Sequence, residues 1–486
     1  MATDSYKITD SFELPGKFWL PGKPDDVAFG RIQCSLDKIA LLLEGGFGES
    51  PPSLQEALMG RFTIDEWPCI LGQTSDGQLC SLYRVLVTGQ NTNDRGIVSR
   101  KCHVHFLLIG QHAEDFQAIR VKRIAVKCSH LLSFAGMRSF DLVPNPQEAG
   151  NEALTVKYAP VKKQSFRIER EQTTLVFRRN AGWNWSKERL TFLAYESIDI
   201  IPDEPQALEC FLNRLAAVCN LLSLLTDEVV APIEVQLSFS GDDFDTWLLY
   251  QPIRAATGDE ERVAVMFNLE QVQDRLEAAL DKWCSAEATL CEAIGLFLDA
   301  RFARGLSLYS QFANLAQSVE AFGRATAVGG YMTKDAYEPI RQALVKAIPT
   351  TVGEGHREAL KKKIEYGYEF SLRKRIETMF STLTAPASAL VCKDVRVFTT
   401  MVVKTRNYLS HRTDELRESA VDGMDLYWTC EQLMILMRLL LLKHFGIEED
   451  LIVERLQNGH RTSQVIANLR KSETAKAPQP SSATPP

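Results

Sequence analysis

The sequence lacks several features that would place it in a common functional class. Its eleven cysteines are scattered and include no Cys-x-x-Cys pair, a usage typical of a reduced cytosol rather than of a disulfide framework. No glycine-rich phosphate loop follows a strand-like run, which argues against a P-loop or Rossmann nucleotide site. The longest apolar run, Leu433 to Leu442, contains Arg438 and is too short to span a bilayer. These absences favour a protein that is neither disulfide-stabilised nor membrane-spanning.

A basic surplus and a targeting segment are also missing. The formal net charge is −7, so any polyanion must bind at a local basic patch rather than through bulk charge. No basic segment followed by an apolar stretch opens the chain, and we therefore expect a cytoplasmic protein without a secretion signal. Cys102, His103 and His105 form the only Cys/His cluster and have no second half nearby. We expect no metal site and no cofactor.

The chain does contain a strand-rich front. Runs of β-type residues broken by turn residues predict strands at Ile32–Leu43, Cys69–Leu71, Leu82–Val87, Val104–Ile109, Ile119–Val126, Leu154–Tyr158, Phe166–Ile168, Thr174–Phe177, Leu190–Phe192, Ile233–Phe239 and Trp247–Tyr250. Thr74-Ser75-Asp76-Gly77 predicts a hairpin turn, because Asp-Gly readily adopts left-handed conformations. An amphipathic helix is expected at about 206–225. We predict a β-sandwich or barrel-like module.

The back of the chain has helical periodicity. We predict helices at about 269–304, 306–327, 333–347, 356–382, 390–411 and 422–445. The Pro-, Ser-, Ala- and Lys-rich end is expected to be disordered. The predicted class is α+β, with a β-rich domain at 1–260, a helical domain at 261–460 and a tail at 461–486.

One motif in the fifth predicted helix suits cleavage of a phosphodiester. In Arg406-Asn407-Tyr408-Leu409-Ser410-His411, arginine supplies a permanent cation for phosphate oxygens and histidine can exchange a proton near neutral pH. The spacing alone is weak evidence, because Arg100 to His105 and Arg455 to His460 share it. We expect the first of these pairs to lie in a strand and the second to cross a helix stop at Asn458-Gly459.

Positive charge is concentrated around this motif. Residues 356–412 contain twelve Lys/Arg and five Asp/Glu. Two basic runs, Lys361, Lys362, Lys363 and Arg373, Lys374, Arg375, are expected on one helix with Tyr366, Tyr368 and Phe370 between them. Such a face could track a nucleic acid backbone and stack bases, or it could be a solvated face whose aromatics belong to the core.

The whole pattern resembles a known family. The Arg406-Asn407-x-x-x-His411 motif in a helical back half, the strand-rich front, and the segments Gly16-Lys17-Phe18-Trp19-Leu20-Pro21, Val27-Ala28-Phe29-Gly30-Arg31-Ile32 and Leu41-Leu42-Leu43-Glu44-Gly45 are similar to HEPN-domain proteins of the ApeA type. This resemblance implies a β-rich N-terminal domain followed by a helical HEPN domain. It also implies an anti-phage effector that cleaves RNA without metal and leaves a 2',3'-cyclic phosphate.

The resemblance assigns roles to the motif. Arg406 would hold the scissile phosphate, His411 would act as general acid or base, and Asn407 would orient a phosphate oxygen or the imidazole. Tyr408 could stack on a base or simply pack, and Arg412 adds a further cation for RNA. Residues five apart on a straight helix differ by about 140° in direction. Arg406 and His411 could therefore meet only if the helix ends near His411 or if a partner chain completes the site. The resemblance implies the second arrangement, a homodimer or higher homo-oligomer, with cellular RNA such as tRNA as substrate and a phage-encoded trigger.

Other interpretations remain open at this stage. The Arg and His could be an ordinary surface cation and a capping histidine, and some HEPN domains serve only as dimerisation or binding modules. Trp183 and Trp185 could belong to a carbohydrate-binding loop, although paired tryptophans more often anchor an interface. Glu320 is a candidate acid of the site and equally an ordinary surface residue.

Overall fold

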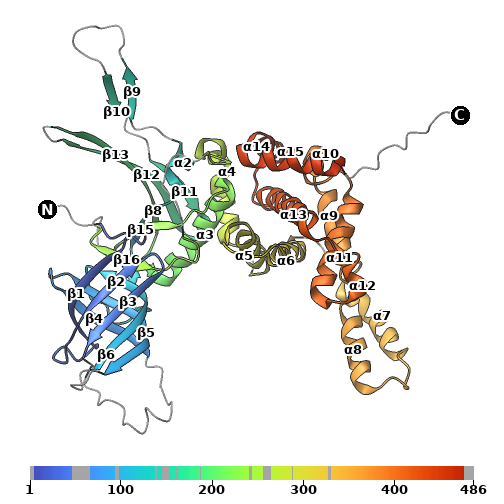
Figure 1. The fold of residues 1–486 in the computed structure, drawn as a ribbon, viewed down its shortest axis with the longest axis horizontal. Helices are drawn as coiled ribbons and strands as arrows, with labels where there is room; N and C mark the ends of the chain where they lie inside the picture. Colours follow the sequence, from blue (N-terminus) through green and yellow to red (C-terminus); the bar gives the residue numbers. More distant parts are fainter. Residues whose placement is uncertain are drawn as a thin grey trace. The chain divides into compact units, whose positions relative to one another are not determined.

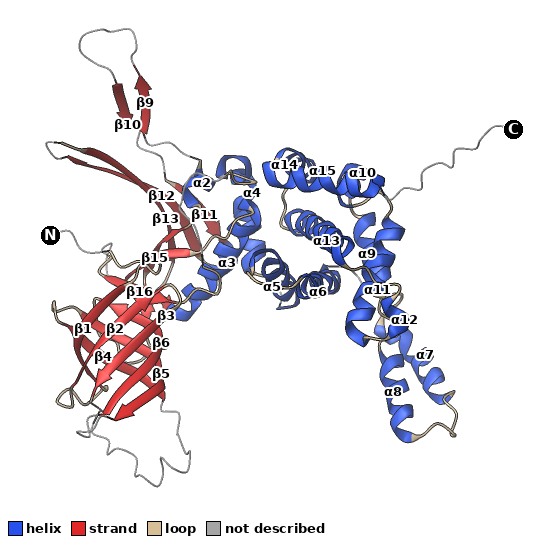
Figure 2. Cartoon of the chain, viewed as in Figure 1, coloured by secondary structure: helices blue, strands red, loops and turns tan. Residues whose placement is uncertain are grey.

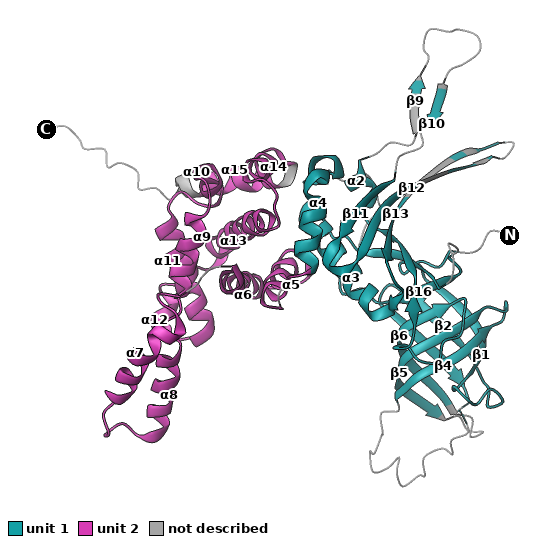
Figure 3. Cartoon of the chain, turned by 180° about the vertical axis from the view of Figure 1, so that it is seen from behind, with its two compact units in different colours: residues 1–284 teal, residues 285–486 magenta. Residues whose placement is uncertain are grey.

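The computed structural model divides the chain into two compact units, 1–284 and 285–486 (Figures 1 and 3). It describes residues 5–45, 47, 66–92, 98–136, 140–144, 154–158, 163–185, 188–239, 244–255, 264–286, 288–326 and 330–475. Among these residues every named strand lies in unit 1, and unit 2 is helical (Figure 2). The predicted α+β class is confirmed. The boundary lies after residue 284 rather than near 260.

Six strands of unit 1 close into a β-barrel. They are β1 (Phe12–Trp19), β2 (Ala28–Ser35), β3 (Lys38–Glu44), β4 (Glu66–Thr74), β5 (Leu79–Thr92) and β6 (Val98–Ile109). The antiparallel order β6-β3-β2-β1-β4-β5 closes because β5 also pairs with β6. Closure removes free sheet edges from this ring. The barrel-like alternative of the sequence prediction therefore applies to this part of the chain.

Local sequence explains the barrel strands. Every second side chain of a strand faces inward, and Phe18, Ile32 and Leu41 are fully buried. The predicted turn at 74–77 joins β4 to β5, with Gly77 at φ 91°. The single strand predicted at 32–43 is wrong, because a turn at residues 36–37 separates β2 from β3. Asp37 is the turn-forming residue within that run.

The end of β6 continues into an extended part of the sheet. Beyond β6 the order is β16 (Thr246–Tyr250), β15 (Pro232–Ser238), β8 (Arg123–Cys128), β13 (Leu190–Pro202), β12 (Thr173–Trp185) and β11 (Gln164–Ile168). Two short pairs, β7 (Arg120–Val121) with β14 (Gln206–Ala207) and β9 (Phe140–Pro144) with β10 (Leu154–Tyr158), complete the strands described. This sheet buries the carboxylates of several ion pairs: Asp199 with Arg123 and Arg178, Glu196 with Arg179, and Glu234 with Lys127.

The helices of unit 1 are α2 (Leu131–Ala135), α3 (Leu208–Thr226) and α4 (Leu269–Cys284). The predicted helix at 206–225 corresponds to α3. By length and composition α3 could cross a membrane, but 61% of that stretch is buried inside the protein. Its apolar residues Phe211, Leu215 and Leu222 are at most 1% exposed, as expected of a core helix.

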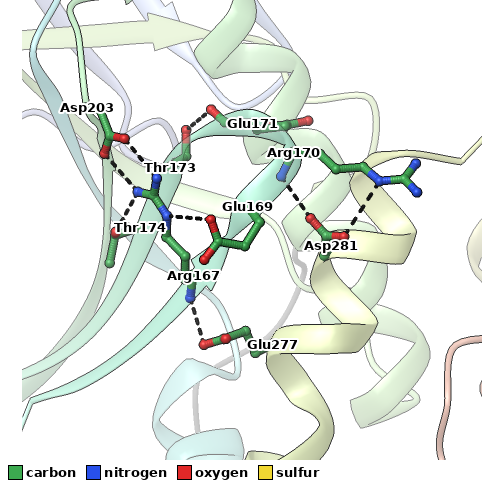
Figure 4. Close-up of polar contacts among 9 residues, drawn as sticks. All are labelled: Arg167, Glu169, Arg170, Glu171, Thr173, Thr174, Asp203, Glu277 and Asp281. Carbon is green, nitrogen blue, oxygen red and sulfur yellow. Dashed lines mark hydrogen bonds and ion pairs between the residues drawn. The ribbon is translucent and has the colours of Figure 1, made fainter.

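Helix α4 is fixed to the sheet by two carboxylates (Figure 4). Glu277 accepts a hydrogen bond of 2.9 Å from the backbone N–H of Arg167, and Asp281 accepts one of 3.1 Å from that of Arg170. The guanidinium of Arg167 donates two bonds of 2.8 Å to Asp203. These contacts explain why α4 belongs to unit 1, although the sequence assigned it to the helical half.

Unit 2 is helical. The helices described in it are α5 (Ala288–Phe302), α6 (Leu308–Thr326), α7 (Lys334–Lys346), α8 (Glu354–Glu365), α9 (Leu372–Ser381), α10 (Ala385–Val391), α11 (Val395–His411), α12 (Asp414–Arg417), α13 (Gly423–His444), α14 (Glu449–Asn458) and α15 (His460–Ala475). The longest of them, α13, packs against α5, α6, α10, α11 and α14. The apolar run 433–442 lies in α13 and is buried throughout. Gly446, with φ 92°, follows the end of α13 as the sequence predicts.

Several predicted helices of this half are divided. The helix expected at 269–304 is α4 and α5, and the one at 390–411 begins at Val395 because Asp394 caps α11. The helix expected at 356–382 is α8 and α9, and α8 instead forms a hairpin with α7 (Figure 1). The tail expected from 461 is helical to Ala475 as α15. Residues 476–486 lie outside the described part of the chain.

Candidate active site

Helix α11 positions the motif through a clear start and a clear stop. The Asp394 side chain accepts hydrogen bonds from the N–H groups of Arg396 and Val397 at 2.8 and 3.0 Å, which is ordinary N-capping. The buried face carries Phe398, Val402 and Thr405, which follow one another at helical spacing. The helix runs through His411 to Arg412, which is left-handed with φ 55° and donates its N–H to the Tyr408 carbonyl at 2.7 Å.

Arg406 faces the neighbouring helix α6. Its guanidinium lies 3.4 Å from a carboxylate oxygen of Glu320, and its side chain is 40% exposed. The same carboxylate pairs with Arg324 at 3.1 Å. Glu320, noted in the sequence as a candidate acid, is therefore shared between two guanidinium groups. Arg406 is held by an ion pair that is open to solvent, and such a pair is weak enough to exchange for another anion.

His411 lies on the opposite side of the same helix. It is exposed, and its side chain makes no hydrogen bond, ion pair or ring contact with any residue that the structure describes. The half-buried Asn407 side chain likewise makes no hydrogen bond within the described ranges. Because α11 stays helical from 406 to 411, the two side chains diverge by about 140°. One chain alone does not bring Arg406 and His411 together.

Two residues that the sequence analysis missed lie beside the motif. The Arg412 guanidinium is 5.3 Å from the ring centre of Tyr408 and 5.8 Å from that of Tyr309, distances typical of cation–π contacts. The Tyr309 hydroxyl donates a 2.7 Å hydrogen bond to Asp422, which lowers the pKa of that carboxyl. Tyr309 and Asp422 are 113 positions apart, so no spacing in the sequence could reveal the pair.

The solvent-facing side of α11 carries a shallow basic cavity. It measures about 330 Å³ and is lined by Arg396, Val397, Thr400, Met401, Lys404 and Ser419. Arg373 of α9 donates a 3.0 Å hydrogen bond to the Thr400 hydroxyl. His411 follows Lys404 by seven residues, which is nearly two full helical turns. His411 therefore lies on the same face of α11 as this cavity. A cationic track therefore leads along α11 towards His411.

The two basic runs occupy different places. Lys361, Lys362 and Lys363 lie on α8, and Arg373, Lys374 and Arg375 lie on α9. Residues 371–412 contain eight Lys/Arg against two Asp/Glu, whereas residues 356–370 contain four against three. The predicted surplus of positive charge therefore lies almost entirely in the segment from α9 to the end of α11. The hypothesis of a single helix that presents both runs is wrong, because Ser371 caps a new helix.

Arg375 differs from its neighbours. It is 4% exposed, and its guanidinium binds Glu369 at 2.9 Å and the carbonyl oxygen of Phe370 at 3.1 Å. Lys374 is exposed. Burial therefore gives Arg375 a structural contact in place of the RNA contact expected from the sequence.

The remaining sequence candidates lie elsewhere. His103 and His105 are on β6 with ring centres 4.8 Å apart, so they share a sheet face, and burial lowers the pKa of His103. Within the described ranges no group of three His, Cys, Asp or Glu side chains is arranged to hold a metal. Trp183 and Trp185 lie in strand β12 rather than a loop and are 61% and 82% exposed.

Comparison with known families identifies both units. The model of ApeA N-terminal domain 1 matches residues 13–283, and the model of the Apea-like HEPN domain matches residues 313–451. No curated protein and no solved structure matches the chain. The first match ends one residue before the division between the two units, and the second contains the whole of α11. The chain therefore belongs to the ApeA-type anti-phage proteins, in which an ApeA N-terminal domain precedes an Apea-like HEPN domain.

Proposed function

We propose that the chain is an endoribonuclease of anti-phage defence that cleaves cellular RNA without a metal through Arg406 and His411. Family membership supports a nuclease-type role in anti-phage defence. The observation that carries the finer proposal is the position of the motif in α11. An exposed imidazole ends the helix, and a guanidinium one and a half turns earlier is held only by a solvent-open ion pair with Glu320.

The chemistry follows from these two groups. His411, or its copy in a second subunit, removes the proton from a ribose 2'-hydroxyl. The 2'-oxygen then bonds to phosphorus while the bond from phosphorus to the 5'-oxygen breaks, and the imidazolium formed in the first step returns a proton to that leaving oxygen. Arg406 exchanges Glu320 for the phosphate and stabilises the charge that develops on its oxygens. The products are a 2',3'-cyclic phosphate and a 5'-hydroxyl, and no step needs a metal.

A second subunit completes the site in this proposal. Arg406 and His411 point in different directions within one chain, whereas two α11 helices that face each other would place the His411 of one chain near the Arg406 of the other. Nearby, Arg412 lies over the rings of Tyr408 and Tyr309, and Asn407 offers an unbonded amide to the phosphate or the imidazole. A homodimer is thus the smallest active assembly that we propose.

The approach of RNA along α11 is part of the same proposal. Arg396, Lys404 and Arg373 line the exposed face that ends at His411. Along the helix axis, Arg396 and His411 are separated by about 22 Å, a length for three or four nucleotides. The α7–α8 hairpin is a further contact for a longer RNA such as tRNA, because Lys362 and Lys363 of α8 are exposed and Lys361 beside them is half-buried.

The decisive experiment is cleavage in EDTA by the purified chain, expressed with and without phage infection as the source of a trigger. We expect His411→Ala and Arg406→Ala each to reduce cleavage by about 10²- to 10⁴-fold. His356→Ala is the matched control, since His356 is an exposed histidine on α8 and should have no effect. Cyclic-phosphate ends on cellular RNA in the wild type but not in His411→Ala would identify the substrate. Retained cleavage in both motif variants would disprove the proposal.

A second candidate function has one observation in its favour. Arg406 is occupied by Glu320 in the single chain, as expected if the HEPN unit serves only for dimerisation while the N-terminal domain senses a ligand or phage protein. This candidate predicts that His411→Ala leaves growth arrest during phage infection unchanged. Loss of growth arrest in that variant, with unchanged dimerisation, would exclude it.

A further inference from the structure

The barrel of unit 1 carries an open groove of about 1040 Å³ that none of the roles above uses. Six strands contribute to it in hydrogen-bonded order. One row of outward residues is Gln73, Lys17, Phe29, Glu44, Ser99 and Asn91, and a parallel row is Pro15, Arg31, Leu42, Lys101 and Gly89. Their neighbours along each strand, such as Phe18, Ile32 and Cys102, face the core and are fully buried. The groove is thus a feature of the outer barrel wall.

Between the two rows, the strand backbones approach each other closely. Gly16 and Gly30 are paired across β1 and β2. A Cβ atom on Gly16 would collide with the carbonyl oxygen of Gln73, and one on Gly30 with that of Leu42. Only glycine permits this approach. The floor at these positions is backbone, so a ligand meets the flanking side chains and peptide groups.

The charge of the rows favours an anion. Lys17, Arg31 and Lys101 are exposed and line the groove, and Glu44 is the one carboxylate among its described lining residues. Arg31 also lies 3.7 Å from Glu13, with both side chains at least half exposed. An exposed ion pair of this kind contributes little to stability, so Arg31 can bind a phosphate in place of Glu13. The local excess of cations contrasts with the net charge of −7 of the whole chain.

Phe29 adds a second chemical feature. Its side chain is 65% exposed, and it lies directly opposite Lys17 on β1 and Glu44 on β3. Exposing a large apolar ring to water is energetically unfavourable, and a flat ligand that stacks on the ring would cover it. Nucleobases are such ligands, because each one has a π-face.

The length of the groove decides between a single nucleotide and a strand. From Gln73 on β4 to Asn91 on β5 the row crosses five strand intervals, about 24 Å at about 4.8 Å each. This exceeds a mononucleotide and matches about four nucleotides, within the range of site sizes of small β-barrels that bind single strands. We propose that the groove binds a single-stranded nucleic acid, with a base stacked on Phe29 and phosphates near Lys17, Arg31 and Lys101. This site goes beyond the proposed cleavage site, because it lies wholly in unit 1.

The test uses the full chain carrying His411→Ala, so that bound RNA stays intact. A fluorescein-labelled eight-nucleotide oligouridylate that contains 4-thiouridine is titrated by anisotropy and then photo-crosslinked. We expect crosslinked peptides from residues 15–31. We also expect Phe29→Ala to weaken binding at least about 5-fold, and Lys17→Ala with Lys101→Ala to lower the salt slope by about 0.7 for each lost phosphate contact.

Matched controls come from the same unit. Lys38→Ala removes an exposed lysine from the same barrel outside the groove, and Trp185→Ala removes an exposed aromatic from β12; neither should change binding. Lys101→Arg should retain it. Crosslinks confined to unit 2, with equal affinity in the groove variants, would overturn the proposal, as would full displacement by uridine monophosphate at equal concentration. None of these readouts requires cleavage, so the proposal can fail or stand independently of the ribonuclease assignment.

Discussion

The two units use charged side chains in opposite ways. In the extended sheet of unit 1, Asp199 is 1% exposed and lies between Arg123 and Arg178. In unit 2, Arg406 remains 40% exposed against Glu320, and His411 lies in solvent. A buried charge must keep its partner, because an unpaired one pays the full cost of leaving water. An exposed cation can exchange a carboxylate for a phosphate. Burial therefore separates arginines that stabilise the fold from those available to a ligand.

The largest expected effect tests the buried side of this comparison. Asp199→Ala leaves two guanidinium groups without their shared carboxylate and should lower the free energy of unfolding by about 3–5 kcal/mol. Denaturant unfolding of the full chain, with hydrogen exchange in β8, β12 and β13, measures the loss. Asp203→Ala is the control, because its bond to Arg167 is exposed to solvent. Equal losses in the two variants would mean that burial does not distinguish these arginines.

A smaller effect tests the same distinction within one basic run. Arg375→Ala removes the buried partner of Glu369 and should destabilise unit 2 by about 2–3 kcal/mol. Lys374→Ala, one residue earlier and exposed, should leave stability unchanged. If RNA follows α9 and α11 as proposed, Lys374→Ala should instead weaken RNA binding. The comparison is wrong if Lys374→Ala destabilises unit 2 as much as Arg375→Ala does.

A third prediction concerns Glu196, a buried carboxyl group whose ionised form is destabilised by burial although Arg179 lies beside it. Burial raises the pKa of Glu196 to about 7, although Arg179 lies 3.0 Å away and acts in the opposite direction. The folded state therefore binds a proton that the unfolded state releases between about pH 4.5 and pH 7. This contribution to stability is complete below about pH 4.5 and is lost as the pH rises through 7.

Replacement by an amide isolates this effect. Glu196→Gln removes the titration, so the difference in unfolding free energy between wild type and variant should change by about 2 kcal/mol across that window. Urea unfolding of both proteins at pH 5, 6, 7 and 8 measures this difference. The titration of all other ionisable groups is common to the two proteins and cancels in the difference. A difference that stays constant with pH would show that Glu196 is ionised throughout and belongs with Asp199 as a stable pair.

Local signals in the sequence predicted much of both units. The turn at 74–77 and helix α3 depend on residues close together in the chain, and the structure confirms them. The break between α8 and α9 had visible signals as well. Gly367 and the capping residue Ser371 both lie there, but the charge and aromatic pattern across them favoured one long helix.

Long-range contacts could not be predicted in this way. Closure of the barrel requires β5 to pair with β6, while β6 also pairs with β3 and β16. The hydrophobic periodicity of a strand indicates which side chains are buried, but it does not indicate which other strand pairs with it. Proline and glycine usually interrupt a strand, yet Pro15 and Gly16 lie within β1. Gly16 is needed there because the backbones of β1 and β4 approach each other too closely for a side chain. For the candidate site the sequence led us to propose Arg406 and His411, but the bond between Tyr309 and Asp422 depends on how α6 and α13 pack.

The smallest predicted effect concerns α4, the helix whose unit the sequence assigned differently. Its carboxylates Glu277 and Asp281 accept backbone hydrogen bonds from the β11 region, and one such bond contributes about 1 kcal/mol. Glu277→Ala should therefore raise hydrogen exchange in α4 about 5-fold and leave α5 and α6 unchanged, since they belong to unit 2. Glu277→Gln, which keeps an acceptor oxygen, should recover part of the protection, and Glu270→Ala, an exposed glutamate on the same helix, should do nothing. Faster exchange that spreads into α5 and α6 would mean that α4 stabilises both units, and the division after residue 284 would then not be a division in stability.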